Sequence, residues 1–170
     1  MPTLYLLRHA NASWGEADEN DHERVLSNQG EREALLIGQF LHQQAIAPQA
    51  VICSSARRTQ QTWDLVAGRL TAPAEAAFER GLYLCGPQAM LQRLRELPRQ
   101  LASVMVIGHN PDVQETALRL CGHGDTALIE DLRRDYPTAG LVELDFEGGW
   151  PDLRRGRGWL RRFIVPKGLI

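Results

Sequence analysis

The 170-residue sequence predicts an α/β fold, in which helices cover both faces of a mostly parallel sheet in a three-layer α/β/α sandwich. Two observations predict it. Short apolar runs of the kind buried on both faces of a parallel sheet recur along the chain. Stretches with helical periodicity separate these runs, and strands that alternate with helices pair in parallel. The length suits a single domain over residues 1–170 with a substantial core.

The first half of the chain shows this alternation clearly. Residues 4–7 are apolar throughout and predict a buried strand, after which residues 11–24 are polar, aperiodic and typical of a loop. Ser27 can cap a helix that runs to about residue 44. Residues 50–53 predict a second buried strand, and Ser54 or Ser55 can cap the next helix.

The second half continues the pattern after a connector at 78–84 that we expect to be irregular. Pro87 can open a helix that ends by Pro98, and residues 103–107 predict a third buried strand. The remaining expected elements are a helix opened by Asn110 and Pro111 and closed by Gly122, a variable stretch at 124–137, and strands at 141–146 and 159–165.

The composition is that of an ordinary globular protein with a formal net charge of −2. This charge gives no global attraction to nucleic acid or to a membrane surface, so we expect neither partner. No apolar run approaches the roughly 18 residues of a membrane span, and the start lacks the pattern of a signal peptide. Three widely spaced cysteines argue against a disulfide framework. We therefore expect a cytoplasmic protein.

Three polar segments follow predicted strands directly: Arg8-His9, residues 54–58, and residues 108–110. The carboxyl ends of parallel strands meet at one edge of a sheet, which is where ligands bind in such folds. We therefore expect these segments to converge. An arginine can hold a phosphate while an imidazole attacks phosphorus, and a histidine at a strand-to-helix junction can stabilise a phosphoryl oxygen.

Each segment alone also has a structural interpretation. Arg8 and His9 can be a surface pair, Arg57 and Arg58 a solvated pair at a helix start, and His109 a histidine satisfied within the fold. Adjacent helical residues do not share a direction, so only one of the two arginines can point into a site. The combination of all three segments at one edge favours a site.

These residues resemble the histidine phosphatase superfamily, which has the phosphoglycerate mutase-like fold. Leu7-Arg8-His9 is similar to its Arg-His-Gly/Ala signature, and residues 54–62 are similar to its Ser-x-x-x-Arg-Ala-x-Gln-Thr pattern, with Thr59 in place of alanine. Residues 108–111 resemble its second-histidine motif. The short length, residues 26–30 and the late Pro-Lys pair resemble the compact SixA-like phosphohistidine phosphatase branch.

The resemblance implies that His9 becomes phosphorylated and that Arg8, Arg58 and His109 complete a phosphate pocket, with Arg57 facing away. It places Asn11 near the phosphate, where it can add a hydrogen bond. Family members often use a glutamate after the second helix as general acid, which makes Glu79 the candidate here. Asp18 and Asp21 are the alternatives, and a solvated carboxylate is the plain interpretation of all three.

We expect no metal and no cofactor. His22, His42 and His123 lack the spacing of a helical zinc site and are interpreted as surface histidines. The resemblance implies a phosphorylated protein, with phosphohistidine, or a small phosphate ester as substrate. Phosphoglycerate mutase-like transfer and a non-catalytic phosphate-binding module are the alternatives. The arginines at 154–162 can dock an acidic protein, and a solvated surface is the simpler interpretation.

Overall fold

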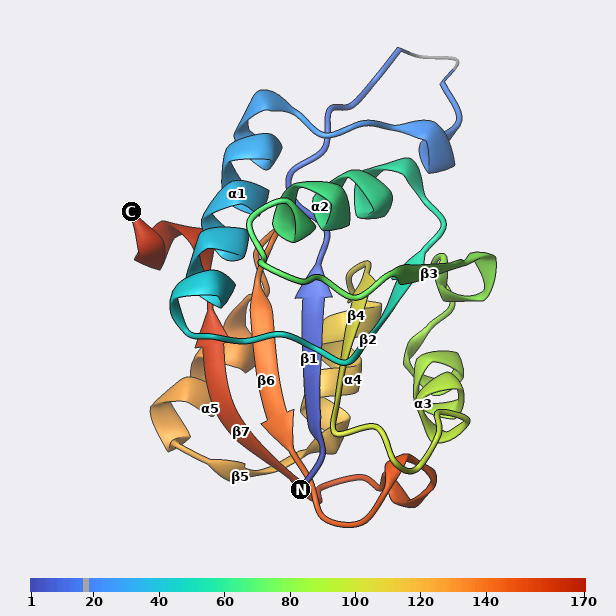
Figure 1. Ribbon diagram of the computed structural model, residues 1–170, viewed down its shortest axis with the longest axis vertical. Helices are drawn as coiled ribbons and strands as arrows, with labels where there is room; N and C mark the ends of the chain where they lie inside the picture. Colours follow the sequence, from blue (N-terminus) through green and yellow to red (C-terminus); the bar gives the residue numbers. More distant parts are fainter. Residues whose placement is uncertain (17–18) are drawn as a thin grey trace.

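The computed structural model describes residues 1–16 and 19–170. These residues form a seven-stranded sheet with the strand order β3-β2-β4-β1-β6-β7-β5 (Figure 1). The neighbours β3-β2, β2-β4 and β4-β1 are parallel, whereas β6 is antiparallel to both β1 and β7. The strands are β1 (Thr3–Arg8), β2 (Ala50–Ser54), β3 (Ala76–Glu79), β4 (Ser103–Gly108), β5 (Cys121–Gly124), β6 (Leu141–Asp145) and β7 (Gly158–Ile164).

Helices cover both faces of the sheet, which confirms the predicted three-layer α/β/α class. Side chains alternate along a strand, so β1 sends Tyr5 and Leu7 to one face and Leu4 and Leu6 to the other. The helices α1 and α2 pack on the first face, and α3, α4 and α5 on the second. Their bounds are α1 (Asn28–Gln43), α2 (Arg57–Ala67), α3 (Pro87–Arg95), α4 (Asp112–Leu120) and α5 (Thr126–Arg134).

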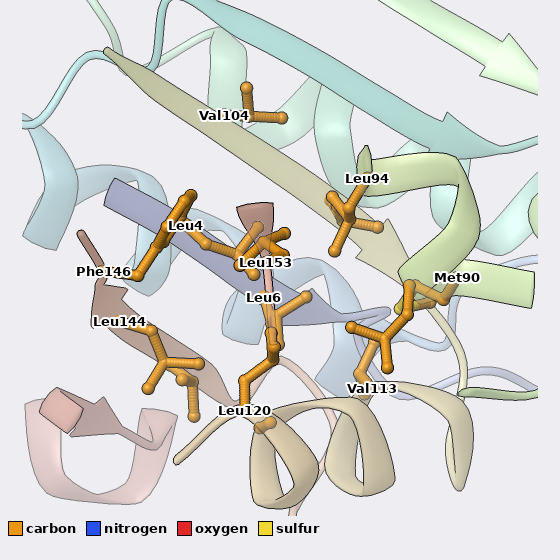
Figure 2. Packing of buried hydrophobic residues seen from close by; sticks show 14 of the residues in the cluster. Leu4, Leu6, Met90, Leu94, Val104, Val113, Leu120, Leu144, Phe146 and Leu153 are labelled. Atoms are coloured by element: carbon orange, nitrogen blue, oxygen red, sulfur yellow. The ribbon is translucent and has the colours of Figure 1, made fainter. Parts of the chain in front are cut away.

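The core on the second face is shown in Figure 2. Leu4 and Leu6 of β1 lie among apolar side chains of α3 and α4, and all of them are fully buried or nearly so. Each such side chain contributes about 1.5–3 kcal/mol relative to leaving it exposed. Continuous apolar runs were the sequence signal for this double burial.

The structure corrects several expected element bounds. The connector at 78–84 begins within an edge strand, β3, which pairs in parallel with β2, and continues into the 3-10 helix η2 (Arg80–Leu82). The stretch at 124–137 contains α5, which begins after Asp125, whose carboxylate accepts a hydrogen bond from the Leu128 backbone N–H. Neither Ser54 nor Ser55 is the cap of α2, since Ala56 holds that position.

The start and end of α4 also differ from the expectation. The helix begins at Asp112 rather than at Pro111, and it ends at Leu120 instead of continuing to Gly122. The residues after it form β5, which pairs in parallel with β7. Propensity within the segment favoured a longer helix, and pairing with a distant strand decided against it.

The helix α1 packs closely on the chain that leaves β1. Ser27 caps this helix by accepting a hydrogen bond from the Gly30 backbone N–H, at 3.0 Å. A methyl group on Gly30 would collide with the carbonyl group of Asn11, two residues beyond His9. Only glycine therefore permits this approach of the helix to the backbone.

We predict that Gly30→Ala lowers the free energy of unfolding by about 1–3 kcal/mol, because the added methyl group must displace backbone. Urea denaturation of the variant and the wild type measures this change in the free energy of unfolding. Gly168→Ala is the matched control, since nothing lies within 4 Å of the added methyl group at that position. Equal stability of the two variants would contradict the close packing of α1 on Asn11.

Candidate active site

The two histidines meet because β1 and β4 are parallel neighbours. The register pairs Arg8 with Gly108, so His9 and His109 follow the two strands at the same level. The His9 backbone N–H donates to the Gly108 carbonyl at 3.0 Å and continues the ladder by one residue. The centroids of the two imidazole rings lie 5.3 Å apart.

His9 is 9% exposed and carries its proton on a defined nitrogen. Nδ1 lies 2.7 Å from the carbonyl oxygen of Ala10, and a carbonyl only accepts, so Nδ1 is the donor. Nε2 then keeps a free electron pair. Burial lowers the pKa of His9 to about 4, against the opposing effect of the Ala10 hydrogen bond, and the positive charges of Arg58 and Arg8 lower it further. The ring is neutral at neutral pH.

His109 is 1% exposed and lies between Arg58 and Ser54. Arg58 Nη2 donates to Nδ1 at 3.3 Å, and Nε2 lies 2.8 Å from the Ser54 hydroxyl. Since the guanidinium has no acceptor, Nδ1 is unprotonated and Nε2 carries the hydrogen. Burial is the main reason that the pKa of His109 falls to about 3, and His9 and Arg58 also lower it.

Arg58 reaches the site from the first turn of α2, where it is 4% exposed, whereas its neighbour Arg57 is exposed. Nη1 donates to the Asp21 carbonyl at 2.8 Å, and Nη2 donates to the Asp21 carboxylate at 3.1 Å. The guanidinium is thus held on one side by Asp21 and on the other by His109. This arrangement fixes a positive fork beside both imidazoles.

Arg8 ends β1 and donates through Nη1 to the carbonyl of Tyr136 at 2.7 Å. Its Nε is buried and has no hydrogen-bond partner among the described residues. Burial lowers the pKa of Arg8, while Asp135 and Glu33 act in the opposite direction. A buried donor without an acceptor is costly, and an anion bound here would satisfy it.

Asn11 lies directly after this turn but is used by the fold. Its side-chain oxygen accepts a hydrogen bond from the Ser27 hydroxyl at 2.6 Å, and its backbone N–H donates to Glu33 at 2.8 Å. The same Glu33 carboxylate accepts from the Thr138 hydroxyl at 2.9 Å. The Ala139 backbone N–H in turn donates to the His9 carbonyl. Glu33 therefore ties together the two loops that flank His9.

Glu79, the candidate acid, forms an ion pair with an arginine of α3. Both of its carboxylate oxygens accept hydrogen bonds from Arg93 of α3, at 2.7 and 2.9 Å. The Arg93 fork thus occupies both oxygens of the Glu79 carboxylate. The geometry thus argues against the candidate acid.

Of the alternative acids, Asp18 lies outside the described residues, and Asp21 lies in the site. The Asp21 carboxylate accepts hydrogen bonds from Tyr83, Arg24 and Arg58. The bond from Tyr83 is the largest cause that holds the pKa of Asp21 far below its ordinary value, and the two arginines add to it. Asp21 is therefore an ionised group that positions Arg58.

Sequence reasoning missed three other contributors. Ser54 orients His109, and Tyr83 donates to Asp21 while its ring centroid lies 5.4 Å from that of His109. His22 was interpreted from the sequence as a surface histidine. Its ring centroid lies 4.8 Å from that of Tyr83, and its Nε2 forms a hydrogen bond with the Ser55 hydroxyl. The position of His22 beside Asp21 in the loop after the first strand was the only available signal.

Comparison with known proteins agrees with this geometry. Residues 4–82 match the family model of the histidine phosphatase superfamily (branch 1). The phosphohistidine phosphatase SixA of Escherichia coli is 30% identical over 120 residues, covering 69% of this chain and 73% of that protein. The chain belongs to the histidine phosphatase superfamily. It is accordingly a hydrolase of the phosphatase class, and the predicted resemblance is confirmed.

Two further relatives align with almost the whole length of this phosphatase. An uncharacterized protein of Mycobacterium tuberculosis is 33% identical, covering 95% of this chain and all of that protein. The SixA structure from Agrobacterium tumefaciens superimposes with a TM-score of 0.83 at 27% identity, over 98% of this chain and 99% of the other. The phosphoglycerate mutase-like fold is thereby confirmed.

Two further findings concern the described part of this phosphatase. It contains no group of three or more His, Cys, Asp or Glu side chains arranged to hold a metal ion. Across residues 1–16 and 19–170, none of the helices has the length and apolar character needed to cross a membrane.

We predict that the stability of the phosphatase falls as the pH is lowered from 7 to 5. The pKa values of His9 and His109 lie below the ordinary 6.5, so the unfolded chain binds protons first. The contribution of the two neutral histidines to the free energy of unfolding is therefore fully present above about pH 6.5. Below that pH it falls by about 1.4 kcal/mol per pH unit for each histidine.

Urea midpoints measured across this range test the prediction. His9→Gln should reduce the slope, whereas the same change at the exposed His42 should leave it as in the wild type. An unchanged slope in the His9 variant would show that this ring is not buried in its neutral form.

Proposed function

We propose that this phosphatase hydrolyses phosphorylated histidine on a protein, without a metal, through a phosphohistidine intermediate on His9. The observation that carries the proposal is the fixed proton on His9 Nδ1, which leaves Nε2 free beside two arginines. An uncharged imidazole with a free electron pair is the nucleophilic form, and the low pKa of His9 maintains it.

The first step forms a bond between His9 Nε2 and phosphorus and breaks the bond between phosphorus and the substrate nitrogen. Arg58 and Arg8 supply N–H donors to the phosphoryl oxygens. His109 lies beside Arg58 and His9. A phosphorylated imidazole that is protonated on its second nitrogen leaves as neutral imidazole. This substrate therefore needs no acid from the enzyme.

The hydrogen bond between His9 Nδ1 and the Ala10 carbonyl also assists the second step, in which the bond between Nε2 and phosphorus breaks. Phosphorylated His9 keeps its proton on Nδ1, held by the Ala10 carbonyl. When water attacks phosphorus, the electron pair returns to Nε2 and His9 leaves as the neutral ring, while the proton of the water goes to the phosphate product. The Ala10 carbonyl thus prepares His9 first as nucleophile and then as leaving group.

The state of the carboxylates favours phosphohistidine over alkyl phosphate esters. An alkoxide is a poor leaving group and needs a proton donor. Within the described residues, Glu79 is paired with Arg93. Hydrogen bonds from Tyr83, Arg24 and Arg58 keep the Asp21 carboxylate ionised. The relative from Escherichia coli is itself called a phosphohistidine phosphatase, which agrees with this preference.

We predict that His9→Ala abolishes hydrolysis of an aryl phosphate, because the change removes the proposed nucleophile. Arg58→Ala should lower kcat/KM by about 10²–10³, the loss typical for a removed donor to a phosphoryl oxygen. The neighbouring Arg57→Ala is the matched control and should leave the rate unchanged, since Arg57 is exposed.

Steady-state rates in excess chelator and trapping of an acid-labile, base-stable phosphoenzyme provide the measurements. A His9 variant with wild-type activity would overturn the proposed nucleophile. Strong inhibition of the wild type by the chelator would overturn the metal-independent mechanism.

We predict that Glu79→Gln does not selectively slow substrates with poor leaving groups, because Glu79 only pairs with Arg93. Rates for a series of aryl phosphates with different leaving-group pKa values measure this. Arg93→Gln breaks the same pair from the other side and should give the same series. A loss for the Glu79 variant that grows with leaving-group pKa would restore Glu79 as the acid.

A further inference from the structure

Large apolar side chains are exposed on the two connections that carry Asp21 and Tyr83. Trp14 is 89% exposed, and Val25 and Leu84 are 38% and 54% exposed. Trp14 and Val25 belong to the loop between β1 and α1, which extends beyond the carboxyl ends of the strands (Figure 1). Exposed apolar side chains that gather in one place mark interaction surfaces. We call these three residues the rim.

A series of contacts connects the rim to the phosphate pocket. The Arg24 guanidinium lies 5.1 Å from the Trp14 ring and donates to the Asp21 carboxylate at 3.1 Å. Asp21 holds Arg58, and it also accepts a hydrogen bond from Tyr83. Leu84 follows Tyr83 in a left-handed backbone conformation, with φ of 49°. The rim therefore extends from Trp14 across Asp21 to Leu84.

Val25 lies in the same part of the rim as Trp14. The Ser13 backbone N–H donates to the Val25 carbonyl at 2.9 Å, and Arg24 Nε donates to the Ser13 carbonyl at 2.8 Å. These bonds keep the two arms of the loop together. A tryptophan held on such a loop is a rigid apolar anchor of the kind that dominates protein interfaces.

The loop that carries Trp14 bears several exposed negative charges. Glu16, Glu19 and Glu23 are exposed on the same loop. These carboxylates oppose the approach of a free phosphate dianion, and they attract basic side chains. The rim therefore fits a polypeptide in which apolar and basic residues flank the phosphorylated histidine, and it fits a small phosphate ester poorly.

We propose that Trp14, Val25 and Leu84, with the three glutamates, are the docking surface for the polypeptide around the phosphohistidine. This inference rests on the proposed function, and it assigns specificity to residues that do not touch the phosphoryl group. Trp14 is the anchor, and the glutamates select basic neighbours of the phosphorylated residue.

The test compares two synthetic phosphohistidine peptides with an aryl phosphate. One peptide carries leucine and arginine around the phosphohistidine, and the other carries glycine and aspartate. The wild type should prefer the first peptide. Trp14→Ala should lower kcat/KM for that peptide roughly tenfold, mainly through KM, as expected for loss of an aromatic anchor. The rate on the aryl phosphate should not change.

Two further variants complete the test. Ile170→Ala, which removes an equally exposed apolar side chain at the chain end, should leave every substrate unaffected. Changing Glu16, Glu19 and Glu23 together to glutamine should reduce the preference between the two peptides and improve the aryl phosphate as substrate. Higher salt should reduce the peptide preference in the wild type in the same way.

The outcomes separate this inference from the proposed function. Hydrolysis of both peptides at equal efficiency, or equal loss on peptide and aryl phosphate in the Trp14 variant, would overturn the docking surface alone. Failure to hydrolyse either peptide by an enzyme that is active on the aryl phosphate would overturn the proposed function and this inference with it.

Discussion

The parallel pairing of β1 with β4 is the constraint on which the site depends. It places His9 and His109 at the same level beyond two neighbouring strands, and the backbone bond from His9 to Gly108 fixes the first ring over the end of the second strand. The third neighbour, β2, pairs with the other side of β4 and leads into α2. Arg58 therefore enters from the remaining side. In this order the carboxyl ends of β2, β4 and β1 are neighbours, which brings the three segments together.

Burial then determines the chemical state of the site. Two imidazoles that would titrate near pH 6.5 in water are kept neutral, because a positive charge in this place would be poorly solvated and would lie beside Arg8 and Arg58. A site that contains two fixed positive charges and two neutral rings suits a phosphoryl group. Asp21 balances part of this charge and holds Arg58 in place.

A second layer of contacts keeps the turn after β1 in position. The Thr62 hydroxyl of α2 accepts a hydrogen bond from the Ala10 backbone N–H, and Glu33 of α1 holds Asn11 and Thr138. Two helices, α1 and α2, thus support the turn. The position of the His9 ring depends on these helices as well as on β1.

Local sequence patterns determined the class of the fold and the segments that form the site. Unbroken apolar runs identified the strands of the sheet interior, and the motifs around His9, Arg58 and His109 stood directly after three of them. These signals are local, because strand burial and helix capping depend on residues close together in the chain. Helix geometry allowed only one of Arg57 and Arg58 to point into the site, and the family resemblance selected Arg58, which the structure turns inward.

Only the tertiary structure decided the rest, because the deciding contacts join residues far apart in sequence. The family resemblance made Glu79 the candidate acid, but Arg93 on the next helix binds it. Asn11 is bound by Ser27, and β3 and β5 exist because β2 and β7 offer them partners. His22 lies between β1 and α1, and Tyr83 lies between η2 and α3. No periodic pattern in the sequence predicts the path of either connection. The sequence alone determined which residues can do chemistry, and three-dimensional pairing decided which of them are free to do it.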